Sequence, residues 1–126
     1  MIKGIGTDII EIDRLRRVYN KFTNKFIDKI LTEREKSRMD CNNSNEYLAG
    51  RFVSKEAVAK ALGTGIGQVN WKDIEILTAE NGQPYVVLHN QAQQMANSMK
   101  VEQIFLSISH SRRNATATTI LETSTV

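Results

Sequence analysis

Two carboxylates in unusual settings suggest where this sequence could do chemistry. Asp8 lies in an isoleucine-rich segment that predicts a strand, where aspartate is disfavoured and has to be explained by a turn, an exposed edge or a ligand. Glu56 lies on a predicted helix between two apolar sectors, one turn before Lys60, so both charged groups should be partly desolvated. Mg²⁺ binds one or two carboxylates together with substrate phosphates and water. Asp8 and Glu56 could form such a site if they meet; otherwise Glu56 and Lys60 are an ordinary helix ion pair.

The end of another predicted strand carries a third candidate group. Ser109 faces one side of this strand, and His110 ends it on the apolar side. Together with Arg112 and Arg113 in the turn that follows, His110 could bind phosphate. The alternative is a purely structural histidine at the end of a strand.

Other kinds of site lack their sequence motifs. Residues 63–67 are glycine-rich but are not followed by the Lys-Ser/Thr of a P-loop, and Gly4-Ile5-Gly6 lacks the third glycine and the helix of a dinucleotide fingerprint. No G-x-S-x-G nucleophile elbow is present. Two histidines and one cysteine, Cys41, argue against a zinc site and exclude an internal disulfide.

Length and composition predict one globular domain over residues 1–126. Hydrophobic residues make up 40% of the chain and charged residues 25%, which is ordinary for a folded protein and argues against disorder. No segment approaches the roughly 18 apolar residues of a membrane span, and the N-terminus lacks a signal peptide's apolar region. We therefore expect a cytoplasmic protein that does not interact with membranes.

Positive charge is concentrated in the first half of the chain. Residues 1–60 hold 13 of the 17 Lys and Arg residues but only 9 of the 14 Asp and Glu residues. The stretch 14–29 carries six basic residues against Asp28 alone. Such a face attracts nucleic acid, anionic lipid or an acidic protein, and the sign of the charge alone does not choose among them. It could equally be a solvated helix face.

Periodicity and turn residues predict an α+β fold in which an antiparallel sheet packs on one long helix. Thr32 and Glu35 form a capping-box pattern that starts a new helix, and Gly63 is placed to end the long one. In the first half, the predicted elements are a strand over 2–12 with an irregularity near its glycines, helical segments within 13–39 broken near 23–24, a polar break at 42–45, and a helix over 46–62. In the second half, they are strands over 74–77 and 85–88 joined by a turn at 81–82, a helix over 90–99, and strands over 104–110 and 115–121.

These segments together resemble the holo-acyl-carrier-protein synthase family, the short bacterial 4′-phosphopantetheinyl transferases. The resemblance extends over essentially the whole chain and implies the fold of that family. It rests on Gly6-x-Asp8 with Glu11-Ile12, on Arg14, on the stretch 47–65, on Asn81-Gly82-x-Pro84 and on Ser107-Ile108-Ser109-His110.

The resemblance implies transfer of the 4′-phosphopantetheine arm of coenzyme A to a serine of apo-acyl carrier protein, in fatty acid biosynthesis. Adenosine 3′,5′-bisphosphate would be released, and a homotrimer with a site at each subunit interface is implied. The implied roles are Asp8 and Glu56 as Mg²⁺ ligands, Asp8, Glu56 and Lys60 in catalysis, Arg51, Lys60, Ser109, His110 and Ser111 in coenzyme A binding, and Arg14, Arg17 and Lys21 in binding the acidic carrier protein.

Two other functions remain open at this point. A small basic nucleic-acid-binding module would explain the charged face, but it leaves Asp8 and Glu56 unexplained because carboxylates repel a phosphate backbone. A catalytically silent subunit that only docks a carrier protein would use the same basic face. Transfer activity separates both from the enzyme.

Overall fold

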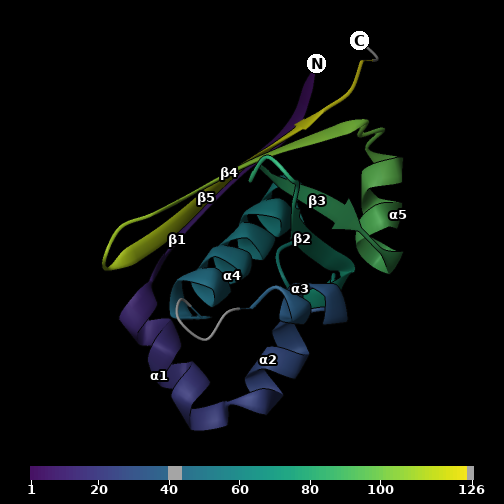
Figure 1. Cartoon of the computed structure of the whole chain (residues 1–126). Coiled ribbons are helices and arrows are strands. Elements are labelled where there is room, and N and C mark those ends of the chain that lie inside the picture. Colours follow the sequence, from purple (N-terminus) through teal and green to yellow (C-terminus); the bar gives the residue numbers. More distant parts are fainter. Residues whose placement is uncertain (40–43, 125–126) are drawn as a thin grey trace.

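A three-stranded antiparallel sheet and one long helix form the centre of the fold (Figure 1). The computed structural model describes residues 1–39 and 44–124. The elements are β1 (Ile2–Glu11), α1 (Ile12–Phe22), α2 (Asn24–Ile30), α3 (Glu33–Ser37), α4 (Ser44–Ala61), a 3₁₀ turn (Trp71–Asp73), β2 (Ile74–Thr78), β3 (Pro84–Leu88), α5 (Asn90–Ser98), β4 (Gln103–His110) and β5 (Asn114–Glu122). Within the described part, no helix is long and apolar enough to cross a membrane.

The sheet has the strand order β1-β5-β4, so the first and last strands of the chain pair with each other. All three strands are antiparallel, while β2 and β3 form a separate hairpin. In Figure 1, α4 lies across one face of the sheet, α1 and α2 lie beyond the end of β1, and α5 lies beside the β2–β3 hairpin. The predicted α+β class, with the sheet packed on one long helix, is confirmed.

Most predicted boundaries agree with the structure. The irregularity in β1 falls between Ile2 and Gly4, the first helical segment breaks at Thr23, and the capping box of Thr32 and Glu35 begins α3. The start of α4 was predicted too late, because Ser44 and Asn45 belong to the helix rather than to a polar break. The remaining residues of that predicted break, 42–43, lie outside the described residues.

Two glycines let β1 approach α4 closely. A Cβ atom on Gly6 would lie 2.0 Å from the carbonyl oxygen of Ala57, and one on Gly4 would lie 2.3 Å from that of Ala61. Both distances are shorter than any non-bonded contact, so only glycine fits at these positions. The close approach places the next inward-facing residue of β1, Asp8, beside the C-terminal half of α4.

The other face of the sheet is open. Strand alternation and burial place nine side chains on it, in three rows across the strands. The rows are Ile5, Ile120 and Phe105; Thr7, Thr118 and Ser107; and Ile9, Thr116 and Ser109. Ile5, Ile9 and Phe105 are 65%, 66% and 47% exposed, which is a large apolar exposure for one sheet.

Beyond α4, buried carboxylates join α3, β2 and the start of α5. Glu75 on β2 is 2% exposed. Its carboxylate accepts hydrogen bonds from the Thr32 hydroxyl (2.5 Å), from the Arg34 guanidinium and from His89 Nε2 (3.0 Å). The histidine is the donor in this pair because an ionised carboxylate only accepts. Burial raises the pKa of Glu75, but the donors from Thr32, Arg34 and His89 outweigh it and bring the pKa to about 2.

Acid should therefore weaken the fold through Glu75. Because the folded-state pKa lies below the ordinary value of 4.5, the carboxylate stabilises the fold above that pH, and this contribution is lost as the pH falls from 4.5 toward 2. The shift corresponds to about 3 kcal/mol in the free energy of unfolding. Urea unfolding between pH 6 and roughly 2.5 should show a shallower loss for Glu75→Gln than for the wild type or for Glu80→Gln, an exposed control. Identical slopes in all three would contradict the assignment.

Candidate active site

Asp8, Glu56 and Lys60 lie together where β1 meets α4. The Lys60 ammonium donates to Asp8 Oδ1 and to the carbonyl oxygen of Thr7, both at 3.2 Å. Thr116 on β5 donates its hydroxyl to the carbonyl oxygen of Asp8 at 2.9 Å, which anchors the backbone of β1 at this residue. A strand residue and a helix residue 52 positions apart thus form one charged cluster.

Burial differs across this cluster. Glu56 is half-buried, as the helix pattern predicts, but the Lys60 side chain keeps 51% of its surface exposed. The expected desolvation of Lys60 is therefore wrong, because β1 is the edge strand of the sheet and leaves the ammonium open to solvent. An exposed ammonium can move toward a bound anion at little cost.

The donor set fits a divalent cation. Burial raises the pKa of Glu56, and the negative charge of Asp8 raises it further, while Lys60 lowers it. The two carboxylates therefore repel each other with only Lys60 to compensate, which is an arrangement that a hard cation relieves. Within residues 1–39 and 44–124, no three His, Cys, Asp or Glu side chains gather as a metal site, so substrate and water would have to supply the remaining ligands.

A second polar group lies on the other flank of α4. Arg51 is 8% exposed, donates from Nη2 to the Thr78 hydroxyl at 2.7 Å and stacks on the Tyr47 ring at 4.4 Å. Its Nε is buried and has no hydrogen-bond partner among the described residues. The adjoining cavity of about 270 Å³ is lined by Arg51, Tyr47, Thr78, His110 and Pro84, among others. Arg51 and His110 thus share one pocket.

The two serines near His110 do not join this pocket. Ser109 pairs with Thr116 on the open face of the sheet, on the side opposite to α4. Ser111 closes the β4–β5 turn, where its amide donates to the Asn114 carbonyl at 2.8 Å and its hydroxyl accepts from the Asn114 amide at 3.3 Å. Within one chain, the structure brings together Arg51 and His110 but not Ser109 or Ser111.

The two polar groups sit at opposite edges of the sheet. Asp8 belongs to β1 and His110 to β4, with β5 between them, so β1 and β4 are about 10 Å apart. The helix α4 packs over β5 between these two strands. Asp8 is level with Ile108, and His110 lies two residue pairs further along the register. One chain therefore presents two separate polar groups, one at each edge of the sheet.

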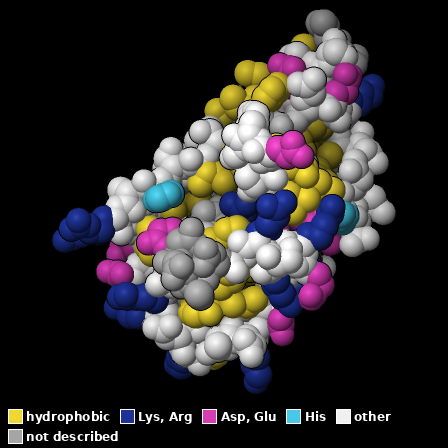
Figure 2. Space-filling view, in the orientation of Figure 1, with side chains coloured by type: hydrophobic (Ala, Val, Ile, Leu, Met, Phe, Trp, Pro, Cys, Tyr) yellow, Lys and Arg dark blue, Asp and Glu magenta, His cyan; other side chains and the backbone are white. Residues whose placement is uncertain are grey.

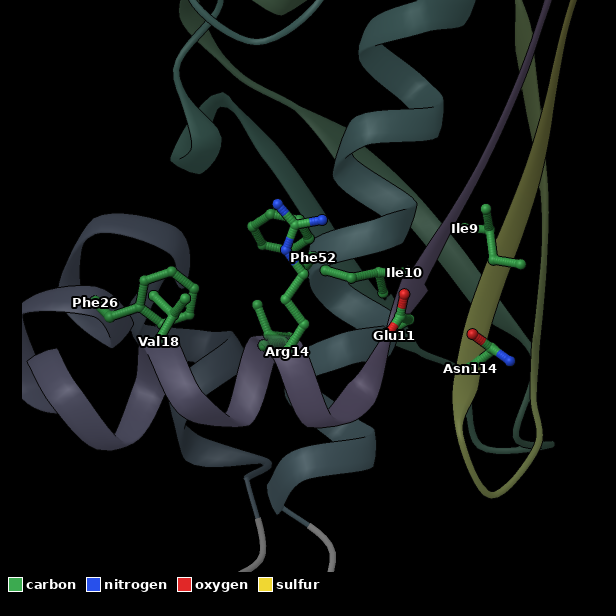
Figure 3. A pocket seen from close by; sticks show the side chains of 9 residues that line it. Ile9, Ile10, Glu11, Arg14, Val18, Phe26, Phe52 and Asn114 are labelled. Carbon is green, nitrogen blue, oxygen red and sulfur yellow. The ribbon is translucent and has the colours of Figure 1, made fainter.

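A third feature is a largely apolar pocket beside α1. Its volume is about 520 Å³, and Val18, Phe26, Phe52 and Ile10 form much of its wall. Arg14 points from α1 across its mouth toward α4 (Figure 3). The pocket follows directly after Asp8 along β1, so it adjoins the carboxylate cluster.

The basic side chains of the first helices are exposed. Arg14, Arg17 and Lys21 all lie on the surface of α1, and Figure 2 shows Lys and Arg side chains along the lower edge of the molecule, where α1 and α2 lie in Figure 1. Arg16, by contrast, forms an ion pair with Asp13 at 3.2 Å. Of the predicted partner-binding residues, Arg14 lines the apolar pocket, while Arg17 and Lys21 are exposed on the same helix.

Comparison with known protein families identifies the class. The chain matches the model of the 4′-phosphopantetheinyl transferase superfamily over residues 4–119. The match includes most of β1 with Asp8, the whole of α4 and β4, and the first part of β5. The chain therefore belongs to this superfamily.

The relatives narrow this to one family within the superfamily. The chain is 57% identical to a holo-[acyl-carrier-protein] synthase of Natranaerobius thermophilus over 122 residues, which cover 96% of this chain and 98% of that protein. It superposes with a TM-score of 0.89 on the crystal structure of the synthase from Neisseria meningitidis (35% identity, 97% and 99% coverage). It superposes with a TM-score of 0.82 on the Bacillus anthracis synthase solved in complex with coenzyme A (3′,5′-ADP) (38% identity, 98% and 99% coverage). It is a member of the holo-[acyl-carrier-protein] synthase family.

Sequence reasoning missed some of the residues that build these sites. Thr78, the partner of Arg51, has no pattern that marks it. Phe26 and Phe52 line the pocket beside α1, and no sequence motif marks a pocket there. Lys55 and Glu35, which form a fully buried ion pair, were recognised only as parts of a motif and a capping box.

Proposed function

We propose that this chain is a cytoplasmic single-domain enzyme, over residues 1–126, that transfers the 4′-phosphopantetheine arm of coenzyme A to a serine of apo-acyl carrier protein. The transfer releases adenosine 3′,5′-bisphosphate and supplies carrier protein for fatty acid biosynthesis. The observation that carries the proposal is the cluster of Asp8, Glu56 and Lys60 between β1 and α4. The names of the relatives and the coenzyme A complex of the Bacillus anthracis synthase support it.

Asp8 and Glu56 would hold Mg²⁺, which would supply positive charge to offset the charge of the coenzyme A phosphates. Lys60 is tethered to Thr7 and Asp8 but half exposed, so its ammonium can pair with the same phosphates or with the leaving group. Glu56 accepts the proton of the carrier serine, directly or through a water that it orients.

The pocket of Arg51 and His110 would take the nucleotide end of coenzyme A. The buried Nε of Arg51 needs an acceptor, and a phosphate oxygen provides one. Ser109 and Ser111 would contribute from the sheet face and the β4–β5 turn. Their position outside the pocket of their own chain is compatible with a contribution to a site shared with a neighbour.

A homotrimer with a site at each interface would bring these two polar groups together. The Asp8 edge of one sheet would meet the His110 edge of the next, and the exposed Ile5, Ile9 and Phe105 of the open face would be buried. A charge in this face should break the assembly. We expect Phe105→Glu to sediment as a monomer with little transfer activity, while Phe22→Glu, on α1 and similarly exposed, should stay trimeric. A trimeric Phe105→Glu would contradict this interface.

The carrier protein would dock on α1, because an acidic surface complements Arg14, Arg17 and Lys21, and the adjoining pocket accepts an apolar side chain beside the modified serine.

Reversing Arg14 and Arg17 to Glu should raise the KM for the carrier protein by about tenfold or more and change the KM for coenzyme A little. Steady-state kinetics at two salt concentrations measure this. The control is Lys72→Glu with Lys100→Glu, which makes the same charge change on exposed residues elsewhere. Equal effects of the two double variants would remove α1 from the docking surface.

One incubation tests the activity itself. Purified protein, coenzyme A, Mg²⁺ and apo-acyl carrier protein are combined, and the carrier is followed by intact-mass spectrometry. A gain of the phosphopantetheine mass that EDTA abolishes supports the enzyme. No gain would favour the silent docking subunit, and steep salt-dependent binding to random DNA without turnover would favour the nucleic-acid module.

A further inference from the structure

Lys55 precedes Glu56 in α4, and its side chain is fully buried. Its ammonium donates three hydrogen bonds, to Glu35 Oε1 at 2.7 Å, to the Trp71 carbonyl at 3.0 Å and to the Ile74 carbonyl at 2.7 Å. These acceptors belong to α3, the 3₁₀ turn and β2. An ammonium has three donors, so every donor of Lys55 is committed in a separate direction.

The main acceptor is itself held in place. Glu35 is fully buried, and its Oε1 accepts from the Thr32 amide at 2.8 Å while its Oε2 accepts from the Ile76 amide at 2.8 Å. The carboxylate therefore cannot follow Lys55 if α4 turns. Lys55 is tied to a frame made of the backbone of α3 and β2.

The contacts of α4 on its β1 side constrain the helix less. There Gly4 and Gly6 pack against Ala57 and Ala61 through small side chains and backbone, and the directed contacts are the two 3.2 Å bonds from the 51% exposed Lys60 to Thr7 and Asp8. Close packing limits how near the helix approaches the sheet but allows small rotations, and an exposed lysine side chain can follow such a rotation. The rotation of α4, which sets where Glu56 points, is therefore held mainly on the buried side of the helix.

We propose that Lys55 is a positioning residue for the transfer reaction. Its three hydrogen bonds fix the rotation of α4 about its axis and the position of the helix along that axis, so that Glu56 and Lys60 face Asp8. Glu56 extends about 100° around the helix from Lys55. A helix rotation of about 20° would move an atom roughly 5 Å from the axis by about 2 Å. A misplacement of about 1 Å can cost about 100-fold in rate.

The chemistry of the pair separates positioning from bulk stability. Lys55 and Glu35 are both fully buried, so the charged pair is kept at a desolvation cost that an apolar pair would not carry. Apolar or neutral replacements can restore packing and stability, but they lose the three directed bonds. Turnover should therefore fall more than stability does.

The inference rests on the proposed function, and the experiment separates the two. Transfer to apo-carrier protein is measured for the wild type, Lys55→Met, the double variant Glu35→Gln/Lys55→Met, and Val58→Ala, a cavity variant at another buried position of α4. Assays run roughly 15 °C below the lowest melting temperature, so that all variants are folded. The double variant is the fallback if Lys55→Met does not fold.

We expect kcat to fall at least about 30-fold for Lys55→Met and for the double variant, with the KM for coenzyme A and for the carrier within about threefold of wild type. Val58→Ala should keep kcat within about threefold at a similar loss of melting temperature. A Lys55→Met or double variant whose kcat is no lower than that of Val58→Ala would overturn the positioning role. A wild type without transfer activity would instead overturn the proposed function.

Discussion

Replacing Glu56 with glutamine is expected to lower kcat for transfer by about 100-fold or more while leaving the fold as stable as the wild type or slightly more stable. The amide keeps the shape of the side chain but removes one proposed metal ligand and the proposed base. Burial and the charge of Asp8 both raise the pKa of Glu56, which means that its ionised form is held against an energetic cost in the folded chain. Removing the charge relieves that cost.

The measurement combines intact-mass kinetics with thermal unfolding at pH 8. Glu80→Gln is the matched control, since it changes an exposed carboxylate in the β2–β3 turn and should alter neither quantity. Wild-type turnover in Glu56→Gln would remove this residue from the site. A large loss of melting temperature would show instead that Glu56 stabilises the fold, and the low kcat would then say little about catalysis.

Much of the fold was accessible from sequence because its signals are local. The alternation of Ile5, Ile9 and their neighbours predicts a strand, Thr32 and Glu35 predict a helix start, and Gly63 predicts a helix end, where its φ of +81° is one that other residues avoid. These signals depend on residues a few positions apart. The α+β class follows from their order along the chain.

The pairing of the first strand with the last was not accessible in this way. No local signal in β1 says that Asp8 lies opposite Ala117, and the register follows from the whole packed sheet. The same holds for Arg51 and Thr78, which lie on different elements. The proximity of Asp8 and Glu56 was inferred from family order rather than from spacing, and its physical origin is the close approach of β1 to α4.

Charged residues show most clearly what cannot be predicted from the sequence pattern. The helix pattern treats Lys55 and Lys60 alike, yet Lys55 is fully buried and the Lys60 side chain is 51% exposed. The difference depends on what packs beside each residue: Lys55 faces α3 and β2, while Lys60 faces the free edge of β1. Composition and periodicity indicate which face of a helix is apolar, but they do not indicate which residues pair with its charged side chains.

The second large effect is expected at Gly6. Alanine there would place a Cβ atom 2.0 Å from the Ala57 carbonyl oxygen and 2.7 Å from the Ala61 amide nitrogen, both backbone atoms of α4 that cannot swing aside. β1 and α4 would have to separate by more than 1 Å, which should cost about 3 kcal/mol or more of the roughly 5–15 kcal/mol that stabilises such a domain. Asp8 is two residues further along β1, so it would move away from Glu56 and Lys60, and transfer should be lost together with stability.

Gly50→Ala separates this effect from the loss of a glycine as such. A Cβ on Gly50 would lie 3.6 Å from Ile108 Cγ2, an ordinary contact, and alanine inside α4 should raise stability by about 0.5–1 kcal/mol. Urea unfolding of both variants measures the difference. If Gly6→Ala unfolds at the wild-type denaturant concentration, β1 does not pack on α4 through this glycine, and the placement of Asp8 beside Glu56 loses its structural basis. A destabilised Gly6→Ala beside an unharmed Gly50→Ala would tie the position of the carboxylate cluster to the absence of a side chain at Gly6.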